Sequence, residues 1–200
     1  DSTGKSYVTD YNSTYGNRVN IFDSSGVYQS QLGTKAPGQF VRPRGVVTDA
    51  SGNLYVVDSS NYRIQKFNSS GAFVKQWGTC GTGDGQFSCN GTISSMAIDN
   101  TNGLIYVLDE GNLRIQEFDL NGTYLDQWGS SGSADGQFKW NEISSGIGGV
   151  AVGLNGDVYV SDHERIQRFD SNGNFQQSFT TEAGVFALAS DISGNIYART

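Results

Sequence analysis

One sequence segment returns along this chain at intervals of 51 residues. Trp77 returns as Trp128, and Phe67 returns first as Phe118 and then as Phe169. A fixed period of this size is typical of an array of supersecondary units, none of which can bury its apolar face alone. This repeat constrains the fold more than any other feature of the sequence.

Each copy of the repeat reads as four short strands joined by tight turns. The chain is rich in Gly, Ser, Thr, Asn and aromatic residues, which suits pleated strands and turns. Four antiparallel strands per copy predict the blade of a β-propeller, so we expect an all-β fold. We expect one domain over residues 1–200, with three full copies and two partial terminal ones, at approximately 1–33, 40–78, 87–129, 138–179 and 185–200. In the second copy the expected strands are 45–48, 54–57, 63–67 and 72–77.

The turns carry an Asp-x-x-Gly motif with a clear mechanism. The Asp side chain accepts a hydrogen bond from the backbone two residues on, and the Gly adopts the positive φ that ends the turn. These strings also resemble fragments of calcium loops, but no distal bidentate carboxylate follows at the required spacing. We therefore predict turns and no metal site at Asp23, Asp49, Asp119, Asp170 and Asp191.

The connections between copies are glycine-rich and end in Gln-Phe. The phenylalanines are Phe40, Phe87 and Phe138. A large aromatic ring at a constant place in such a crossover is expected to fill the gap between neighbouring blades.

The two ends of the chain are irregular. The first copy begins at its second strand, and the last copy stops after its second strand, near residues 195–198. Three arrangements remain open: a small closed propeller with a spare strand, a larger propeller truncated at both ends, or an arc completed by another subunit. The abrupt start at Asp1 is typical of a processed or excised chain.

The repeated residues resemble a known family, the NHL-repeat β-propellers. The resemblance rests on Gly-Asp-Gly-Gln-Phe at 83–87, on the run at 45–67 and on Trp77-Gly78, and it covers nearly the whole chain. NHL-like propellers commonly have six blades, so this chain is short for the family. The histidine of the family name is absent from Asn61-Tyr62-Arg63-Ile64 and from the corresponding stretch at 112–115.

An Asp and an Arg recur in the first four copies, on either side of the turn between the second and third strands. A ring of equivalent pairs is what structural repetition predicts, so we interpret them as hydrogen-bonded ion pairs and not as a site. The pairs are Asp10/Arg18, Asp58/Arg63, Asp109/Arg114 and Asp162/Arg165.

The two cysteines, Cys80 and Cys89, bracket one glycine-rich loop. They are either two free thiols in a reducing compartment or a disulfide that staples the loop in an oxidising one. The even count and the shared loop favour the disulfide. Zinc is disfavoured because structural sites need four ligands, and the chain offers two thiols and one distant histidine, His163.

The charge pattern excludes several partners. The formal net charge is −7, and the thirteen Lys and Arg are scattered without a basic stripe. This argues against binding to nucleic acid, although some members of the family bind RNA, and against an anionic membrane surface. No apolar run approaches the length of a membrane span.

An enzyme of this fold would need several inward His, Asp or Glu side chains from different blades, as in the lyases, lactonases and esterases that share it. The first strand of each blade should line the channel, and the candidates there are small or apolar. We therefore predict no catalytic residues and no cofactor. The candidates are Val46, Thr48, Ser95, Ala97, Val150, Val152, Leu188 and Ser190.

Four N-glycosylation sequons begin at Asn12, Asn68, Asn90 and Asn121. Their number is close to chance for this composition, but all four fall in expected turns and loops, where modification is possible.

These observations favour a secreted, non-catalytic scaffold or interaction module that binds a protein, a glycan or copies of itself. The incomplete terminal blades suggest head-to-tail assembly into a filament or oligomer. Two alternatives remain: a channel-metal hydrolase or lyase, and a ligand-binding sensor domain excised from a larger membrane-anchored protein.

Overall fold

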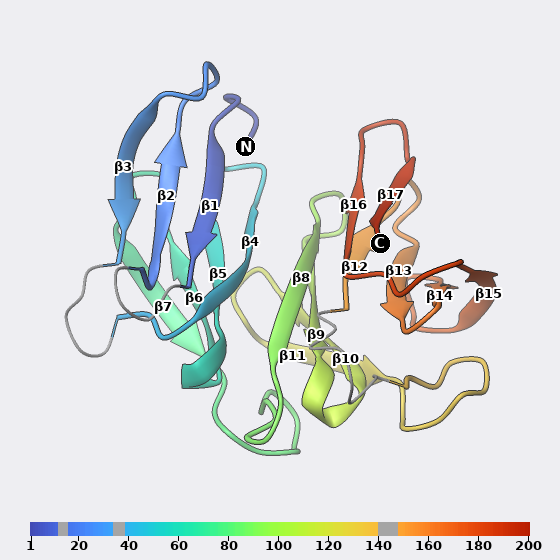
Figure 1. The fold of residues 1–200 in the computed structure, drawn as a ribbon. Helices are drawn as coiled ribbons and strands as arrows, with labels where there is room; N and C mark the ends of the chain where they lie inside the picture. The colour runs from blue at the N-terminus through green and yellow to red at the C-terminus, as the bar shows by residue number, and fades with distance from the viewer. Residues whose placement is uncertain (12–15, 34–38, 140–147) are drawn as a thin grey trace. The chain divides into compact units, whose positions relative to one another are not determined.

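The computed structural model describes residues 1–11, 16–33, 39–139 and 148–200, and in them the chain is almost entirely strand and turn (Figure 1). The chain divides into two compact units, Asp1–Ile93 and Ser94–Thr200. Each unit is built from antiparallel sheets whose strands follow one another in chain order. We number these sheets as blades 1 to 5 along the chain.

The first unit holds blades 1 and 2 (Figure 1). Blade 1 has three strands and blade 2 has four, with antiparallel pairing throughout. The strands are β1 (Ser6–Asp10), β2 (Arg18–Phe22), β3 (Tyr28–Leu32), β4 (Pro43–Thr48), β5 (Leu54–Asp58), β6 (Arg63–Phe67) and β7 (Phe73–Trp77).

The second unit holds blades 3 and 4, with four strands each, and the two-stranded blade 5; strand β8 begins at the last residue of the first unit. Blade 3 contains β8 (Ile93–Asp99), β9 (Leu104–Asp109), β10 (Arg114–Asp119) and β11 (Tyr124–Trp128). Blade 4 contains β12 (Val150–Val152), β13 (Val158–Asp162), β14 (Arg165–Phe169) and β15 (Phe175–Thr180), and blade 5 contains β16 (Ala187–Ser190) and β17 (Ile196–Arg199).

The sheets confirm the predicted all-β fold with four-stranded antiparallel blades, including the incomplete first and last copies. Strand β4 begins two residues earlier than expected, because Pro43 pairs with Asp58 across a bulge. The structure also contains two short 3₁₀ helices that were not predicted from the sequence. They are η1 (Ser59–Asn61) and η2 (Glu110–Asn112), and they lie between the second and third strands of blades 2 and 3.

The Asp-x-x-Gly turns form as predicted. In each, one carboxylate oxygen accepts the backbone N–H groups two and four residues on, and the Gly has a positive φ. The structure adds a sixth turn of this kind at Asp1–Gly4, where Asp1 accepts the N–H groups of Thr3 and Lys5. The first described residues therefore form the turn that leads into β1.

Neighbouring blades within each unit share an apolar core. In the first unit Val19 packs with Leu54, Val56 and Phe67. In the second unit Tyr106, Leu108 and Ile115 pack with residues of blade 4 that include Val158, Val160 and Phe169.

The crossover phenylalanines are buried, as predicted: Phe40 is 5% exposed, and Phe87 and Phe138 are fully buried. The rings of Phe40 and Phe67 lie 5.7 Å apart, which places Phe40 between blades 1 and 2. The Phe87 ring also explains the Trp-Gly motif, because a Cβ on Gly78 would lie only 2.5 Å from it. Gly78 has a φ of 101°, which a side chain would disfavour as well.

Candidate functional site

The repeated carboxylates lie at the ends of the second strands, and the structure brings every one of them to its predicted arginine. Asp58 and Asp109 are fully buried, and Asp162 is 1% exposed. Their Oδ2 atoms accept the arginine Nε–H at 2.8, 3.0 and 2.9 Å respectively. The Asp10–Arg18 pair of blade 1 is 3.1 Å long but half-exposed.

Each buried carboxylate is surrounded by further donors that the sequence analysis did not single out. Asp58 also accepts hydrogen bonds from Asn61, from the Nε2 of Gln65 at 2.9 Å and from the backbone N–H of Val41 at 2.7 Å. Gln65 in turn donates to the carbonyl of Gln39 in the crossover. The pair therefore fixes the crossover to the blade, and its carboxylate oxygens are occupied by these donors.

Blade 4 repeats this arrangement. Asp162 accepts the N–H of Lys139 at 2.7 Å, and both Arg165 and Gln167 donate to the carbonyl of Gln137. The signal for the glutamines was present in the recurring Arg-Ile-Gln string, whose second polar residue shares a face with the arginine. We interpret the network as structural, since it is equivalent from blade to blade.

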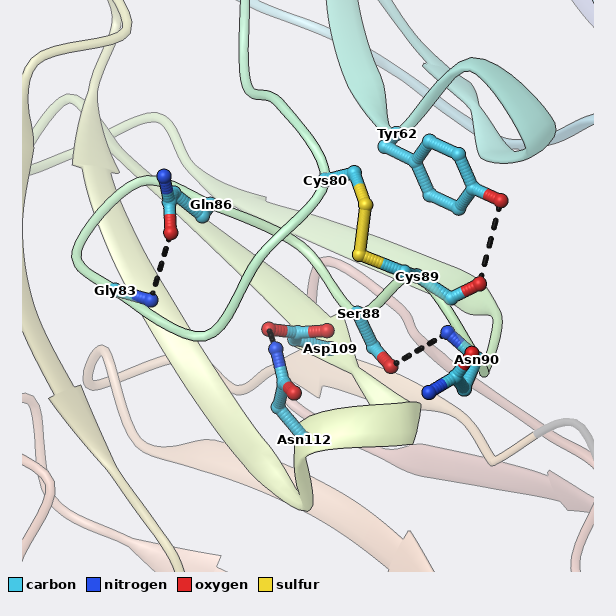
Figure 2. Close-up of a disulfide and its surroundings, with 9 residues drawn as sticks. All are labelled: Tyr62, Cys80, Gly83, Gln86, Ser88, Cys89, Asn90, Asp109 and Asn112. Atoms are coloured by element: carbon cyan, nitrogen blue, oxygen red, sulfur yellow. Dashed lines mark hydrogen bonds between the residues drawn. A yellow bond between two sulfur atoms is a disulfide. The ribbon is translucent and has the colours of Figure 1, made fainter.

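The predicted disulfide between Cys80 and Cys89 is confirmed (Figure 2). Within the loop that it closes, Gly83 donates to the side-chain oxygen of Gln86 at 3.0 Å. The hydroxyl of Tyr62 donates to the carbonyl of Cys89 at 3.3 Å. Both cysteines lie in an exposed part of the loop.

The glycosylation candidates differ in their surroundings. Asn90 and Asn121 are exposed. Asn68 is half-buried, and its Oδ1 accepts the N–H groups of Ser70 and Ala72, which engages the oxygen and not the nitrogen that would carry a glycan. Asn12 lies outside the described residues. Glycosylation stays a prediction at all four positions.

Among the described residues, no three His, Cys, Asp or Glu side chains come close enough together to hold a metal ion. His163 lies in the turn between β13 and β14 with a φ of 59°, and its Nδ1 is 3.9 Å from the exposed carboxylate of Glu164. No helix in the described part of the chain is long and apolar enough to cross a membrane.

Burial or hydrogen bonding perturbs the pKa values of several described carboxyl groups. Burial raises the pKa of Glu117, and the facing carboxylate of Asp126 raises it further. Hydrogen bonds from Asn174 lower the pKa of Asp170. Hydrogen bonds from Asn195 lower the pKa of Asp191 to about 2. The two lowered values belong to aspartates of the Asp-x-x-Gly turns, so they report turn geometry and not catalytic chemistry.

A cleft of about 680 Å³ opens in the first unit beside β1 and the start of β4. Two arginines contribute to its wall, which gives it a cationic side in an acidic chain. The lining residues are Val8, Thr9, Asp10, Tyr11, Asn20, Arg42 and Arg44.

Comparison with known proteins identifies the repeat. A family model described as a 6-bladed β-propeller matches residues 44–128. NHL repeat-containing protein 3 of Mus musculus is 30% identical over 65% of the chain and 40% of its own length. The protein brain tumor of Drosophila melanogaster is 28% identical over 71% of the chain and 13% of its own length. The repeats of this chain are therefore NHL-type β-propeller repeats.

Similar solved structures support the fold of this chain but indicate nothing about its function. A streptogramin B lyase superposes with a TM-score of 0.69 at 13% identity, over 99% of this chain and 59% of its own. A virginiamycin B lyase from Staphylococcus aureus superposes with a TM-score of 0.66 at 14% identity, over 98% and 60%. The chain spans well under two thirds of the curated relatives named above.

Proposed function

We propose that this chain is a non-catalytic interaction module that works outside the cell as a scaffold for protein or glycan partners. The disulfide between Cys80 and Cys89 supports an extracellular location, because disulfides persist mainly in oxidising compartments. The exposure of Asn90 and Asn121 is compatible with glycosylation there. The likeness to NHL-repeat proteins supports a binding role through loops held on a rigid scaffold.

The observation that carries the interaction part is an uncovered sheet face on blade 1. Val8 of β1 is 49% exposed, whereas its counterparts in the next three copies, Val56, Val107 and Val160, are fully buried. An exposed apolar side chain at a position that the repeat otherwise buries marks a surface suited to a partner.

The packing inside each unit indicates what such a partner would look like. Tyr7 of blade 1 packs against the cluster that contains Val56 of blade 2, and Tyr106 of blade 3 shares a cluster with Val160 of blade 4. The valine side of one blade thus receives the tyrosine side of the blade before it. By this internal template, the face around Val8 fits the tyrosine side of another blade.

Blade 5 offers a tyrosine side of this kind. Tyr197 of β17 is 57% exposed, whereas Tyr55 and Tyr106 at the same position are fully buried. We therefore propose that copies associate head-to-tail, with the β16–β17 hairpin of one copy against blade 1 of the next. Repetition of such a contact gives a filament unless it closes into a ring.

Sedimentation velocity and electron microscopy of the native protein test this proposal. We expect concentration-dependent oligomers or filaments, which Val8→Asp and deletion of residues 185–200 abolish. Val27→Asp is the matched control, because Val27 is 57% exposed in the turn between β2 and β3 of the same blade and does not line the cleft that contains Val8. A monomer at every concentration, or assembly that survives Val8→Asp, would refute it.

The non-catalytic part has a separate test. Metal analysis after exhaustive dialysis should find no stoichiometric ion. Zinc or calcium retained at one equivalent would instead favour the channel-metal hydrolase or lyase.

A further inference from the structure

The cleft beside β1 carries two arginines that are not part of the repeat. Counted from the crossover phenylalanine, Arg42 corresponds to Cys89 in the next copy; counted from the following turn aspartate, Arg44 corresponds to Ser94. Residues that recur in every copy hold the fold together. A pair of cations that occurs in one copy only, and lines a cleft, needs a different explanation.

The backbone at Arg42 is held in an unusual conformation by its neighbours. Arg42 has a φ of 53°, which is uncommon for a residue with a long side chain, and its N–H donates to the side-chain oxygen of Asn17 at 2.9 Å. On the preceding residue, Val41 donates its N–H to Asp58 and accepts a hydrogen bond from the N–H of Ser60. These hydrogen bonds fix the backbone from which the Arg42 side chain extends. Such preorganisation is what a binding site requires.

Arg44 is also positioned from two sides. Its carbonyl accepts a hydrogen bond from the hydroxyl of Thr9 at 2.8 Å, and its guanidinium lies 5.8 Å from the centre of the Tyr11 ring. Its Nε is buried and has no hydrogen-bond partner among the described residues. A ligand in the cleft would therefore meet the terminal guanidinium nitrogens of Arg44 and not this atom.

The charge of the two arginines is not neutralised within the described part of the chain. Neither Arg42 nor Arg44 forms an ion pair there, whereas Arg18, Arg63, Arg114, Arg165 and Arg168 each lie near a carboxylate. Asp10 lines the same cleft but is already paired with Arg18 at 3.1 Å.

We propose that this cleft binds the carboxylate of an acidic sugar. The forked donors of Arg42 and Arg44 match a carboxylate, and the oxygens of Asp10 and Asn20 suit sugar hydroxyl groups. The ring of Tyr11 is 59% exposed and supplies an apolar surface for the C–H face of the sugar. A cleft of about 680 Å³ lies within the usual range for small-ligand sites. The inference rests on the proposed interaction function and names the chemistry of one partner.

The experiment is isothermal titration calorimetry on the full chain with three probes: glucuronate, neutral glucose and inorganic phosphate. The first variant, R42A/R44A, removes both charges. The second, R42K/R44K, keeps both charges but removes the forked donors. The control is K5A/K75A, which removes two exposed positive charges from the same unit and so matches the change in net charge. Circular dichroism checks that each variant is folded.

We expect glucuronate to bind the wild type and K5A/K75A equally, and glucose to bind neither. R42A/R44A should weaken glucuronate binding about tenfold or more, as expected when hydrogen bonds to a charged group are lost, with R42K/R44K in between. Equal affinity of R42A/R44A and wild type would overturn the proposal, as would tighter binding of phosphate than of glucuronate at the same arginines.

A change in sedimentation without any change in glucuronate binding would also overturn it, because the arginines would then belong to a contact between copies. Loss of the sugar site with assembly intact would leave the proposed scaffold function standing. Val8 lines the cleft and also belongs to the face proposed for assembly, so a bound sugar and a partner blade would compete for that surface. R42A/R44A, which leaves Val8 in place, and deletion of residues 185–200, which lies outside the cleft, still let the two ideas fail separately.

Discussion

The Cys80–Cys89 bridge offers the sharpest test of how this chain is stabilised, because the chain contains its own control. The loop between blades 3 and 4 has the same backbone pattern without a bridge. Gly81 donates to Phe87 at 2.8 Å in one loop, and Gly132 donates to Phe138 at 3.1 Å in the other. The same parallel bridge, Cys80 to Phe87 or Ser131 to Phe138, occurs in both.

Since the unbridged loop adopts the same hydrogen bonds, the disulfide is not needed to shape the native loop. The disulfide should therefore stabilise the protein by lowering the conformational entropy of the unfolded chain. For cysteines nine residues apart, the chain-entropy relation gives about 2.6 kcal/mol of stabilisation at 25 °C. We therefore expect the free energy of unfolding to fall by about this amount in Cys80→Ser/Cys89→Ser.

The assay is equilibrium urea unfolding followed by circular dichroism, with oxidised wild type, reduced wild type and the double variant side by side. Reduced wild type and the double variant should agree. Ser131→Ala, at the exposed counterpart of Cys80, should stay within about 0.5 kcal/mol of wild type. Amide exchange at Gly81 and Phe87 should remain protected in the folded double variant. A stability change near zero, or loss of that protection, would refute the reasoning.

Three further predictions follow from buried groups. Phe138→Ala removes a fully buried ring from the core between blades 3 and 4, so it should lower the free energy of unfolding by about 3–5 kcal/mol in urea titrations. Asp58→Asn leaves the charge of Arg63 without its buried partner and should cost about 3 kcal/mol in the same assay, whereas Asp10→Asn at the half-exposed pair should cost less than about 1 kcal/mol; equal losses would contradict this account. Because the pKa of Glu117 is raised in the folded state, its contribution to stability is fully present below the ordinary pKa of a glutamate, about 4.3, and is lost as the pH rises through the folded value. In unfolding titrations, the free energy of unfolding of wild type minus that of Glu117→Gln should therefore decrease as the pH rises from acid to neutral.

Much of the fold could be predicted because the repeat presents the same local chemistry several times. The turn aspartates, the crossover phenylalanines and the Asp–Arg pairs each recur at fixed offsets, so one interpretation had to fit every copy. The left-handed residues could not be predicted. Tyr62 and Leu113 have φ values of 55° and 56° at the ends of η1 and η2, where local preference would favour Gly or Asn. The buried carboxylates of Asp58 and Asp109, which accept from Asn61 and Asn112, hold these turns by contacts that propensity does not reveal.

The cleft arginines were missed for the opposite reason. A search for repeated features emphasises what the copies share, and Arg42 and Arg44 are informative because the other copies lack them. The same comparison assigns different roles to chemically similar groups. Arg63 pairs with a buried carboxylate that recurs in blades 3 and 4, so removal of Arg63 should lower the stability of the fold. Arg42 and Arg44 line a cleft and form no ion pair among the described residues. Their removal should therefore weaken ligand binding and leave the free energy of unfolding nearly unchanged. In a repeat protein, a charged residue is therefore best interpreted after comparison with its counterparts, because recurrence favours a structural role and departure favours a binding one.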